Sequence, residues 1–192
     1  MAGKGWAVWF VGLPGSGKSS VAVSVVERLR EQGFAVVYLQ MDERRKVYFP
    51  NPEYTSEERA KAYEMFVEEA AKLVEQGQNV VMDGTAAKAE MRDQARQKID
   101  NFVEIHIDCS LETAMQREAD RPEGLVMSGL YSKALKRKKD GSQFPGLGPV
   151  IGVDVPFERS DQAELRVDND GNKSLDDAVS EVMDFLKHRL DK

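Results

Sequence analysis

The sequence predicts an α/β domain in which helices cover both faces of a mostly parallel, five-stranded sheet. Short apolar runs of strand length occur at residues 6–11, 34–39, 79–82, 102–107 and 165–167. Segments with apolar residues at helical spacing separate most of these runs, so strands and helices alternate along the chain. This alternation is typical of three-layered domains built around a parallel sheet.

The first predicted strand leads directly into Gly12-Leu13-Pro14-Gly15-Ser16-Gly17-Lys18-Ser19, which has the G-x-x-x-x-G-K-[ST] spacing of a phosphate-binding loop. A helix is predicted to follow over residues 20–30. The glycines allow backbone N–H groups to surround a phosphate, and the helix N-terminus adds positive partial charge. We expect Lys18 to contact the β- and γ-phosphates, Ser19 to contact Mg²⁺, and Ser20 to lie beside them. The stretch therefore predicts binding of a nucleoside triphosphate.

A strand, a loop and a long helix are predicted after the first helix. Gly33 ends the first helix, and the strand over residues 34–39 leads to Asp42, a candidate to orient or deprotonate an acceptor hydroxyl. Residues 47–54 contain two prolines and are expected to form a loop. A long helix is predicted over residues 56–76, with Ser56 as its N-cap.

The third strand ends at Asp83, which is a candidate base or Mg²⁺ partner or, alternatively, the cap of the helix over residues 86–98. Beyond the fourth strand, shorter elements are expected. They are helices over residues 111–119 and 128–138, a glycine- and proline-rich segment over 141–156, and a closing helix capped by Ser174. Residues 111–160 are expected to form a lid and a substrate loop.

The composition limits what the chain can be. A length of 192 residues fits one domain over residues 1–192, and a formal net charge of -6 makes extensive nucleic-acid binding unexpected. The single cysteine, Cys109, excludes an internal disulfide and fits a reducing cytoplasm. No apolar run approaches the roughly 20 residues needed to cross a bilayer, so we expect no membrane partner.

Four further stretches resemble motifs of the adenylylsulfate kinases, which use ATP to phosphorylate the 3′-hydroxyl of adenosine 5′-phosphosulfate. Residues 39–45 resemble L-D-G-D-N-V-R and residues 108–115 lie close to C-P-L-E-V. Residues 129–134 resemble G-L-Y-K-K-A, and residues 152–158 resemble G-I-D-x-P-Y-E. The resemblance covers nearly the whole chain. It implies a P-loop kinase fold, ATP and Mg²⁺ as cofactors, a small nucleotide substrate and a possible homodimer.

The resemblance also assigns site residues. It implies that Asp42 contacts Mg²⁺ and substrate, and that Arg45 and Lys133 contact the substrate. The last motif adds Gly152, Val153 and Phe157, of which Phe157 either stacks on an adenine or packs in the core. Lid cations are expected to stabilise the transferring phosphoryl group and to bind the nucleotide. The candidates are Arg117 and Arg121, for which the alternative is a solvated helix surface.

The chain departs from the family at several positions. Gln40 replaces the first carboxylate of D-G-D, and Glu64 and Met65 replace paired arginines, so that Glu64 would repel an anionic substrate. A shifted helix would bring Arg59 or Lys61 into that role. Asp83-Gly84-Thr85 replaces I-S-P-Y-R, and an insertion lengthens the substrate loop at about residues 140–149. These departures leave open a different hydroxyl acceptor (a nucleotide, a sugar or a polynucleotide end) or a non-catalytic nucleotide-binding protein.

Overall fold

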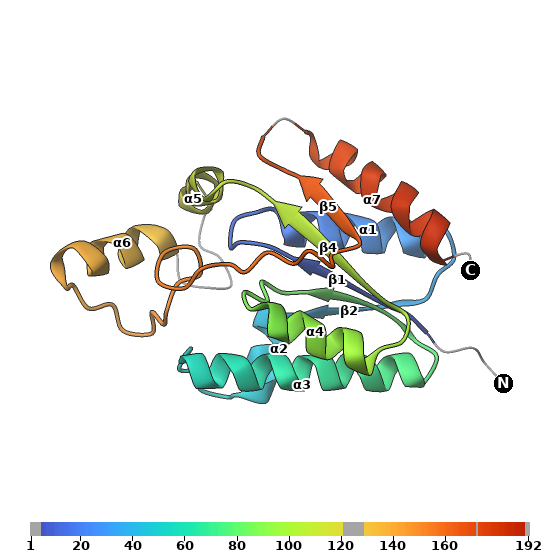
Figure 1. Cartoon of the computed structure of the whole chain (residues 1–192), viewed down its shortest axis with the longest axis horizontal. Coiled ribbons are helices and arrows are strands. Elements are labelled where there is room, and N and C mark those ends of the chain that lie inside the picture. The colour runs from blue at the N-terminus through green and yellow to red at the C-terminus, as the bar shows by residue number, and fades with distance from the viewer. Residues whose placement is uncertain (1–4, 121–128, 172, 191–192) are drawn as a thin grey trace.

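The computed structural model describes residues 5–120, 129–171 and 173–190, and five strands in this part of the chain form one sheet (Figure 1). The strands are β1 (Ala7–Val11), β2 (Val36–Gln40), β3 (Asn79–Asp83), β4 (Phe102–Asp108) and β5 (Leu165–Asp168). Their order is β2-β3-β1-β4-β5, and each of these pairings is parallel. The predicted fold class is confirmed.

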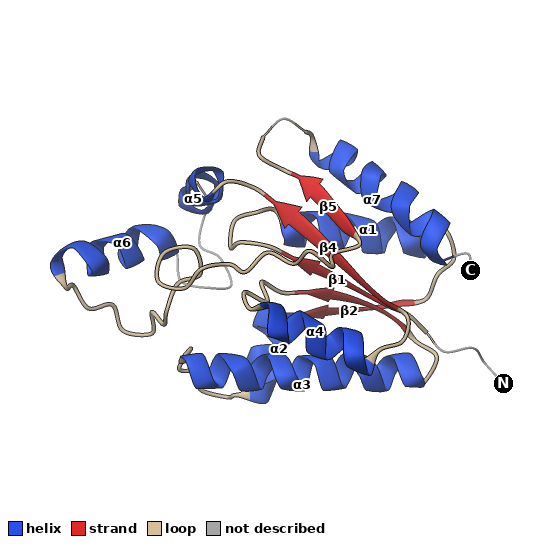
Figure 2. Ribbon diagram, viewed as in Figure 1, coloured by secondary structure: helices blue, strands red, loops and turns tan. Residues whose placement is uncertain are grey.

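Helices cover both faces of the sheet (Figure 2). Helices α1 (Lys18–Glu31) and α7 (Leu175–Leu190) lie on one face. Helices α2 (Met41–Tyr48), α3 (Ser56–Glu75) and α4 (Ala89–Lys98) lie on the other face. Helices α5 (Leu111–Ala119) and α6 (Leu130–Asp140) lie beyond the carboxyl ends of the strands. None of the helices in the described part of the chain has both the length and the apolar character that a membrane crossing requires.

The three layers follow from the alternation of side chains along the strands. On β1, Val8 and Phe10 pack with residues of α1 and α7, whereas Ala7 and Trp9 pack with residues of α3. Trp9 is fully buried, and its ring lies 5.8 Å from that of Phe66. Because both faces of β1 are apolar, this strand is buried at the centre of the sheet.

Three predicted details of the helices were wrong. Thr55, not Ser56, is the N-cap of α3, and its side-chain oxygen accepts a hydrogen bond from the Glu58 N–H at 3.1 Å. The predicted loop over residues 47–54 begins inside α2, which buries only Met41 and Arg45 and therefore lacks the apolar periodicity of a longer helix. Helix α4 begins three residues later than predicted.

The glycine- and proline-rich segment over residues 141–156 is irregular, as predicted, but it has its own apolar cluster. Leu147 and Val150 pack against Tyr131 and Ala134 of α6. The Arg137 side chain donates hydrogen bonds to the Leu147 and Gly148 carbonyls and pairs with Asp154 at 2.6 Å. Side-chain contacts thus order a segment that lacks backbone ladders.

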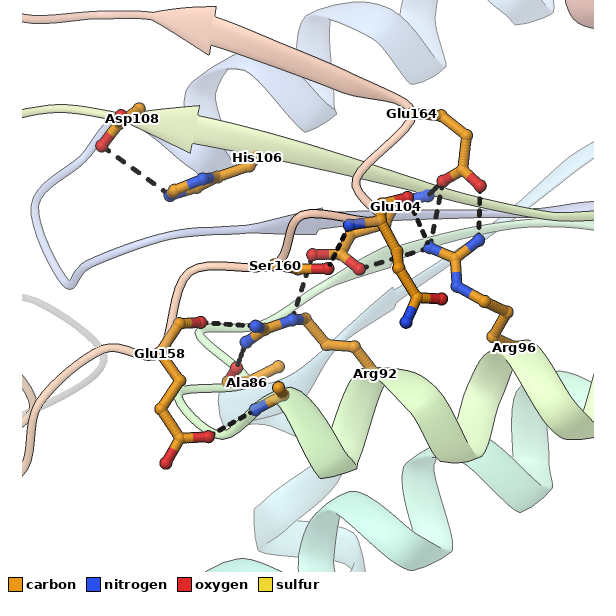
Figure 3. A network of polar contacts seen from close by, with 11 residues as sticks. Ala86, Arg92, Arg96, Glu104, His106, Asp108, Glu158, Ser160 and Glu164 are labelled. Atoms are coloured by element: carbon orange, nitrogen blue, oxygen red, sulfur yellow. Dashed lines mark hydrogen bonds and ion pairs between the residues drawn. The ribbon is translucent and has the colours of Figure 1, made fainter.

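A buried charge network joins the β3–α4 connection to the segment that precedes β5 (Figure 3). The Arg92 side chain is fully buried, and its Nε lies 3.0 Å from Glu104 Oε1. It also donates hydrogen bonds to the carbonyls of Ala86 and Glu158. Arg96 pairs with the same Glu104 from the next turn of α4. Arg92 thereby holds two irregular segments in place.

We expect Arg92→Leu to lower the free energy of unfolding by about 3–5 kcal/mol, because it leaves the buried Glu104 carboxylate without its main partner. Urea unfolding measures this loss. The matched control is Lys98→Ala, which breaks the exposed Lys98–Glu68 pair and is expected to cost less than about 1 kcal/mol. Equal losses in the two variants would contradict the structural role of Arg92.

Candidate active site

The phosphate-binding loop connects β1 to α1 and requires glycine at three positions, Gly12, Gly15 and Gly17. Gly15 has a φ of +83°, and a Cβ at this position would lie 2.3 Å from the Ala114 carbonyl oxygen of α5. Gly17 is the N-cap of α1 and has a φ of +90°. The first turn of α1 carries no acidic residue, so nothing in that turn offsets the positive partial charge at the helix N-terminus. The loop thus presents N–H groups and positive charge to an anion.

A cavity of about 560 Å³ opens beside this loop, within the range of roughly 300–1,000 Å³ usual for small-molecule sites. The ends of β2 and β3, the beginnings of α2 and α3, and residues 146–151 form its walls. The predicted site residues that line it are Pro14, Gly15, Gly17, Lys18, Ser19, Asp42, Arg45, Arg59 and Asp83. The predicted phosphate-loop residues Gly12, Leu13, Ser16 and Ser20 do not line it.

Two aspartates, Asp42 and Asp83, line this cavity. Asp42 lies in the first turn of α2, and burial raises the pKa of its carboxyl group. The charge of Lys18 opposes this rise, whereas the charge of Asp83 adds to it, so the three groups lie within electrostatic range of one another. A carboxylate with a raised pKa is a better proton acceptor.

Asp83 ends β3 and is 2% exposed. Its Oδ2 accepts a hydrogen bond from the Tyr38 hydroxyl at 2.8 Å. Burial, together with the Asp83 charge, raises the pKa of Tyr38, so the phenol stays protonated and acts as the donor. The alternative that Asp83 caps the next helix is wrong, because the N-cap of α4 is Lys88 and no side chain caps it.

Two arginines form the other end of the cavity. Arg45 is 4% exposed, lies 3.3 Å from Glu58 Oε1, and has its guanidinium carbon 5.2 Å from the centre of the Tyr54 ring. Arg59 donates a hydrogen bond to the Pro149 carbonyl at 2.8 Å. Burial lowers the pKa of Arg59, and the nearby charge of Arg45 contributes in the same direction. Two guanidinium groups that line one cavity within electrostatic range of each other favour an anionic ligand.

The expectation that Glu64 repels an anionic substrate was wrong. Glu64 pairs with Lys61 at 2.8 Å, and both side chains are about half exposed and do not line the cavity. Of the two cations considered as substitutes for the family's paired arginines, Arg59 therefore faces the cavity and Lys61 does not.

Other predicted residues lie outside the cavity. The Arg117 guanidinium donates hydrogen bonds to the Asn169 carbonyl at 2.8 Å and to the Ser16 carbonyl at 3.4 Å, so it contacts the back of the phosphate-binding loop. Lys133 lies on α6 and does not line the cavity. Arg121 falls outside the described residues.

The three residues taken from the last motif also lie elsewhere. Gly152 and Phe157 line a second, smaller cavity of about 250 Å³. The Phe157 ring stacks on His106 with 5.0 Å between ring centres, and the Arg92 guanidinium lies 5.3 Å from its centre. Val153 packs against the apolar cluster of α6. Of the two roles considered for Phe157, this packing supports the structural one.

Sequence reasoning missed three tyrosines of the site, Tyr38, Tyr54 and Tyr63, whereas residues 146–151 fall within the expected substrate loop. Tyr63 accepts a hydrogen bond from the Ala86 N–H at 2.8 Å and so holds the connection after β3. A close look at helical spacing would have found Tyr63, because it lies one turn after Arg59. No local signal marks Tyr38 or Tyr54.

A phosphate-binding loop at the N-terminus of α1, with carboxylates from two strand ends and a pair of arginines in one cavity, defines a kinase of the phosphate-loop class. Residues 4–168 match the family described as adenylylsulphate kinase, and the chain belongs to this family. The predicted single domain, the homodimer and the cytoplasmic location stay predictions.

Individual relatives are similar over most of their length. A probable adenylyl-sulfate kinase from Archaeoglobus fulgidus is 30% identical over 167 residues, which cover 87% of this chain and 97% of that protein. A cytidine diphosphoramidate kinase from Campylobacter jejuni is 27% identical over 94% of this chain and 96% of its own. The APS kinase of Mycobacterium tuberculosis in complex with AMPPNP and APS superposes with a TM-score of 0.79, at 28% identity over 96% of this chain and 99% of its own.

We expect Lys18→Ala to weaken ATP binding at least about tenfold, because it removes a cavity-lining cation that we expect to contact the phosphates. Isothermal titration calorimetry with ATP measures the dissociation constant. Lys61→Ala is the matched control, since it removes a lysine that lies outside the cavity. Unchanged affinity in Lys18→Ala would place the nucleotide elsewhere.

Proposed function

We propose that the chain transfers the γ-phosphoryl group of ATP to the 3′-hydroxyl of adenosine 5′-phosphosulfate. One observation carries this proposal: a single cavity joins the phosphate-binding loop to Asp42 and to the paired Arg45 and Arg59. The loop suits the donor triphosphate, and the arginines suit an acceptor with a phosphosulfate group. The adenylyl-sulfate kinases among the relatives support this acceptor.

In the proposed reaction, Lys18 and the loop amides hold the β- and γ-phosphates, and the arginines orient the acceptor. Asp42 accepts the proton of the acceptor hydroxyl. The hydroxyl oxygen forms a bond to the γ-phosphorus, the bond from that phosphorus to the β–γ bridging oxygen breaks, and ADP leaves. The position of Asp42 near both Lys18 and Arg45 supports this role, because the two cations belong to the donor and acceptor ends of the cavity.

The residues at the donor end also fit Mg²⁺. The Asp83 Oδ1 oxygen is buried and accepts no hydrogen bond from the described residues, and Ser19 and Asp42 line the same cavity. Mg²⁺ is usually held by one or two carboxylates together with substrate phosphates. Ser19, Asp42 and Asp83 would hold the ion, which when bound neutralises charge on the phosphates.

Cytidine diphosphoramidate is the second candidate acceptor. A kinase named for it matches this chain over nearly its whole length, and Gln40 and Asp83 depart from the adenylylsulfate kinase motifs. Both acceptors are nucleotides that carry a second acidic group, so Arg45 and Arg59 suit either one. The base and the terminal group distinguish them.

Both acceptors can be compared in one assay. The protein is mixed with ATP and Mg²⁺, and ADP release is followed with adenosine 5′-phosphosulfate, with cytidine diphosphoramidate, and with neither. We expect adenosine 5′-phosphosulfate to give the larger kcat/KM, and identification of a 3′-phosphorylated product completes the test. A larger value with cytidine diphosphoramidate would select the second candidate. ATP binding without stimulation by either compound would reject both.

We expect Arg59→Ala to raise the KM for the acceptor at least about tenfold and to leave the KM for ATP within about twofold, because Arg59 lies at the acceptor end of the cavity. Initial rates with each substrate varied in turn measure both constants. Lys61→Ala is the control, since Lys61 is two residues away on α3 and its side chain is exposed. An unchanged acceptor KM in Arg59→Ala would remove this arginine from the site.

A further inference from the structure

Gln40 and Asp83 are direct partners in the register of β2 and β3. Paired residues on neighbouring parallel strands place their side chains on the same face of the sheet, about 4.8 Å apart. The adenylylsulfate kinase motif has a carboxylate at the position of Gln40, whereas this chain has a neutral amide there. At this level of the sheet the carboxylate is therefore Asp83 of β3 instead. Strand β3 lies next to β1, which leads into the phosphate-binding loop.

The neutrality of Gln40 is consistent with this arrangement. Like charges at directly paired positions of a sheet destabilise it. Asp83 is already buried, and Asp42 lies close enough for its charge to be felt. A carboxylate at position 40 would be the third in this region and would repel Asp83, its direct partner on β3.

Tyr38 fixes the direction of the Asp83 carboxylate. It lies two residues before Gln40 on β2, so it occupies the same face of the sheet, and its ring packs against the apolar cluster beneath α1. Its hydroxyl donates to Asp83 Oδ2 at 2.8 Å. With Oδ2 bound, the oxygen left for a ligand is Oδ1, which is buried and has no partner among the described residues.

A buried oxygen without a partner is costly unless a ligand satisfies it. Asp83 lines the cavity together with Lys18 and Ser19, which belong to the donor end. We propose that Asp83 replaces the carboxylate absent at position 40, and that Tyr38 is the positioning residue that presents Asp83 Oδ1 to the metal of the bound nucleotide. This inference rests on the proposed phosphoryl transfer but not on the identity of the acceptor.

Moving the carboxylate tests the first half of the proposal. Mn²⁺ binding to the protein–ADP complex is measured by electron paramagnetic resonance for the unmodified chain, for Asp83→Asn and for the double variant Asp83→Asn/Gln40→Asp. We expect Asp83→Asn to weaken Mn²⁺ binding at least about tenfold and the double variant to recover at least about threefold of that loss. Glu43→Gln, which neutralises an exposed carboxylate on α2, is the control and should bind as the unmodified chain does.

Unchanged Mn²⁺ affinity in Asp83→Asn, or no recovery in the double variant, would overturn the proposal for Asp83. No acceptor is present in this measurement. A chain that binds Mn²⁺–ADP as expected but fails to phosphorylate either candidate acceptor would therefore refute the proposed function alone.

Tyr38→Phe tests the positioning role, because it removes the hydroxyl and keeps the ring in the core. We expect Mn²⁺ affinity to fall about three- to tenfold and kcat to fall with it, while the acceptor KM stays within about twofold. The thermal midpoint is recorded for the same sample. A lower midpoint with unchanged Mn²⁺ affinity would show that Tyr38 is only structural and would overturn its assignment.

Discussion

The parallel register of β1 with its neighbour β3 is the constraint on which the site depends. Phe10 pairs with Asp83, so the strand that carries the phosphate-binding loop and the strand that ends in a buried carboxylate finish at the same level. Strand β2 then aligns Gln40 with Asp83, and Asp42 follows at the beginning of α2. Carboxyl ends of parallel strands collect ligands because loops and helix N-termini meet there. Here the register also decides which strand contributes the carboxylate.

The walls of the cavity depend on a different kind of interaction. Two of these walls, the connection after β3 and residues 146–151, are irregular backbone, so side chains satisfy the groups that a strand ladder would otherwise pair. Ala86, at a φ of +43°, is held by Tyr63 on its N–H and by Arg92 on its carbonyl. Arg59 and Arg137 do the same for the loop over residues 146–151. Arg59 also faces the cavity. The same side chain therefore holds the loop over residues 146–151 and places positive charge at the acceptor end of the cavity.

The sequence predicted the features that local patterns determine. Apolar periodicity located the sheet and most helices, and the glycine spacing located the phosphate-binding loop. Asp42 and Asp83 were found because they lie at the ends of strands that must meet, and Arg45 was found through the resemblance to the family motif. Glu64 was misjudged because matching by position ignores which side of α3 a residue occupies. Tyr38 could not be predicted, since its contact with Asp83 depends on pairing between strands that lie more than 30 residues apart.

The charge of the cavity explains why a metal belongs to the proposed reaction. Among its described lining residues, the cations Lys18, Arg45 and Arg59 are matched in number by the carboxylates Asp42, Asp83 and Glu118. The chain as a whole carries a formal charge of -6, so the rest of the chain has no net positive charge. A nucleoside triphosphate and an anionic acceptor together bring several negative charges into this balanced site. Loop amides contribute only partial charges, so in the proposed reaction a divalent cation that enters with the nucleotide would supply the remaining neutralisation, and the Asp83 oxygen without a partner among the described residues is suited to receive it.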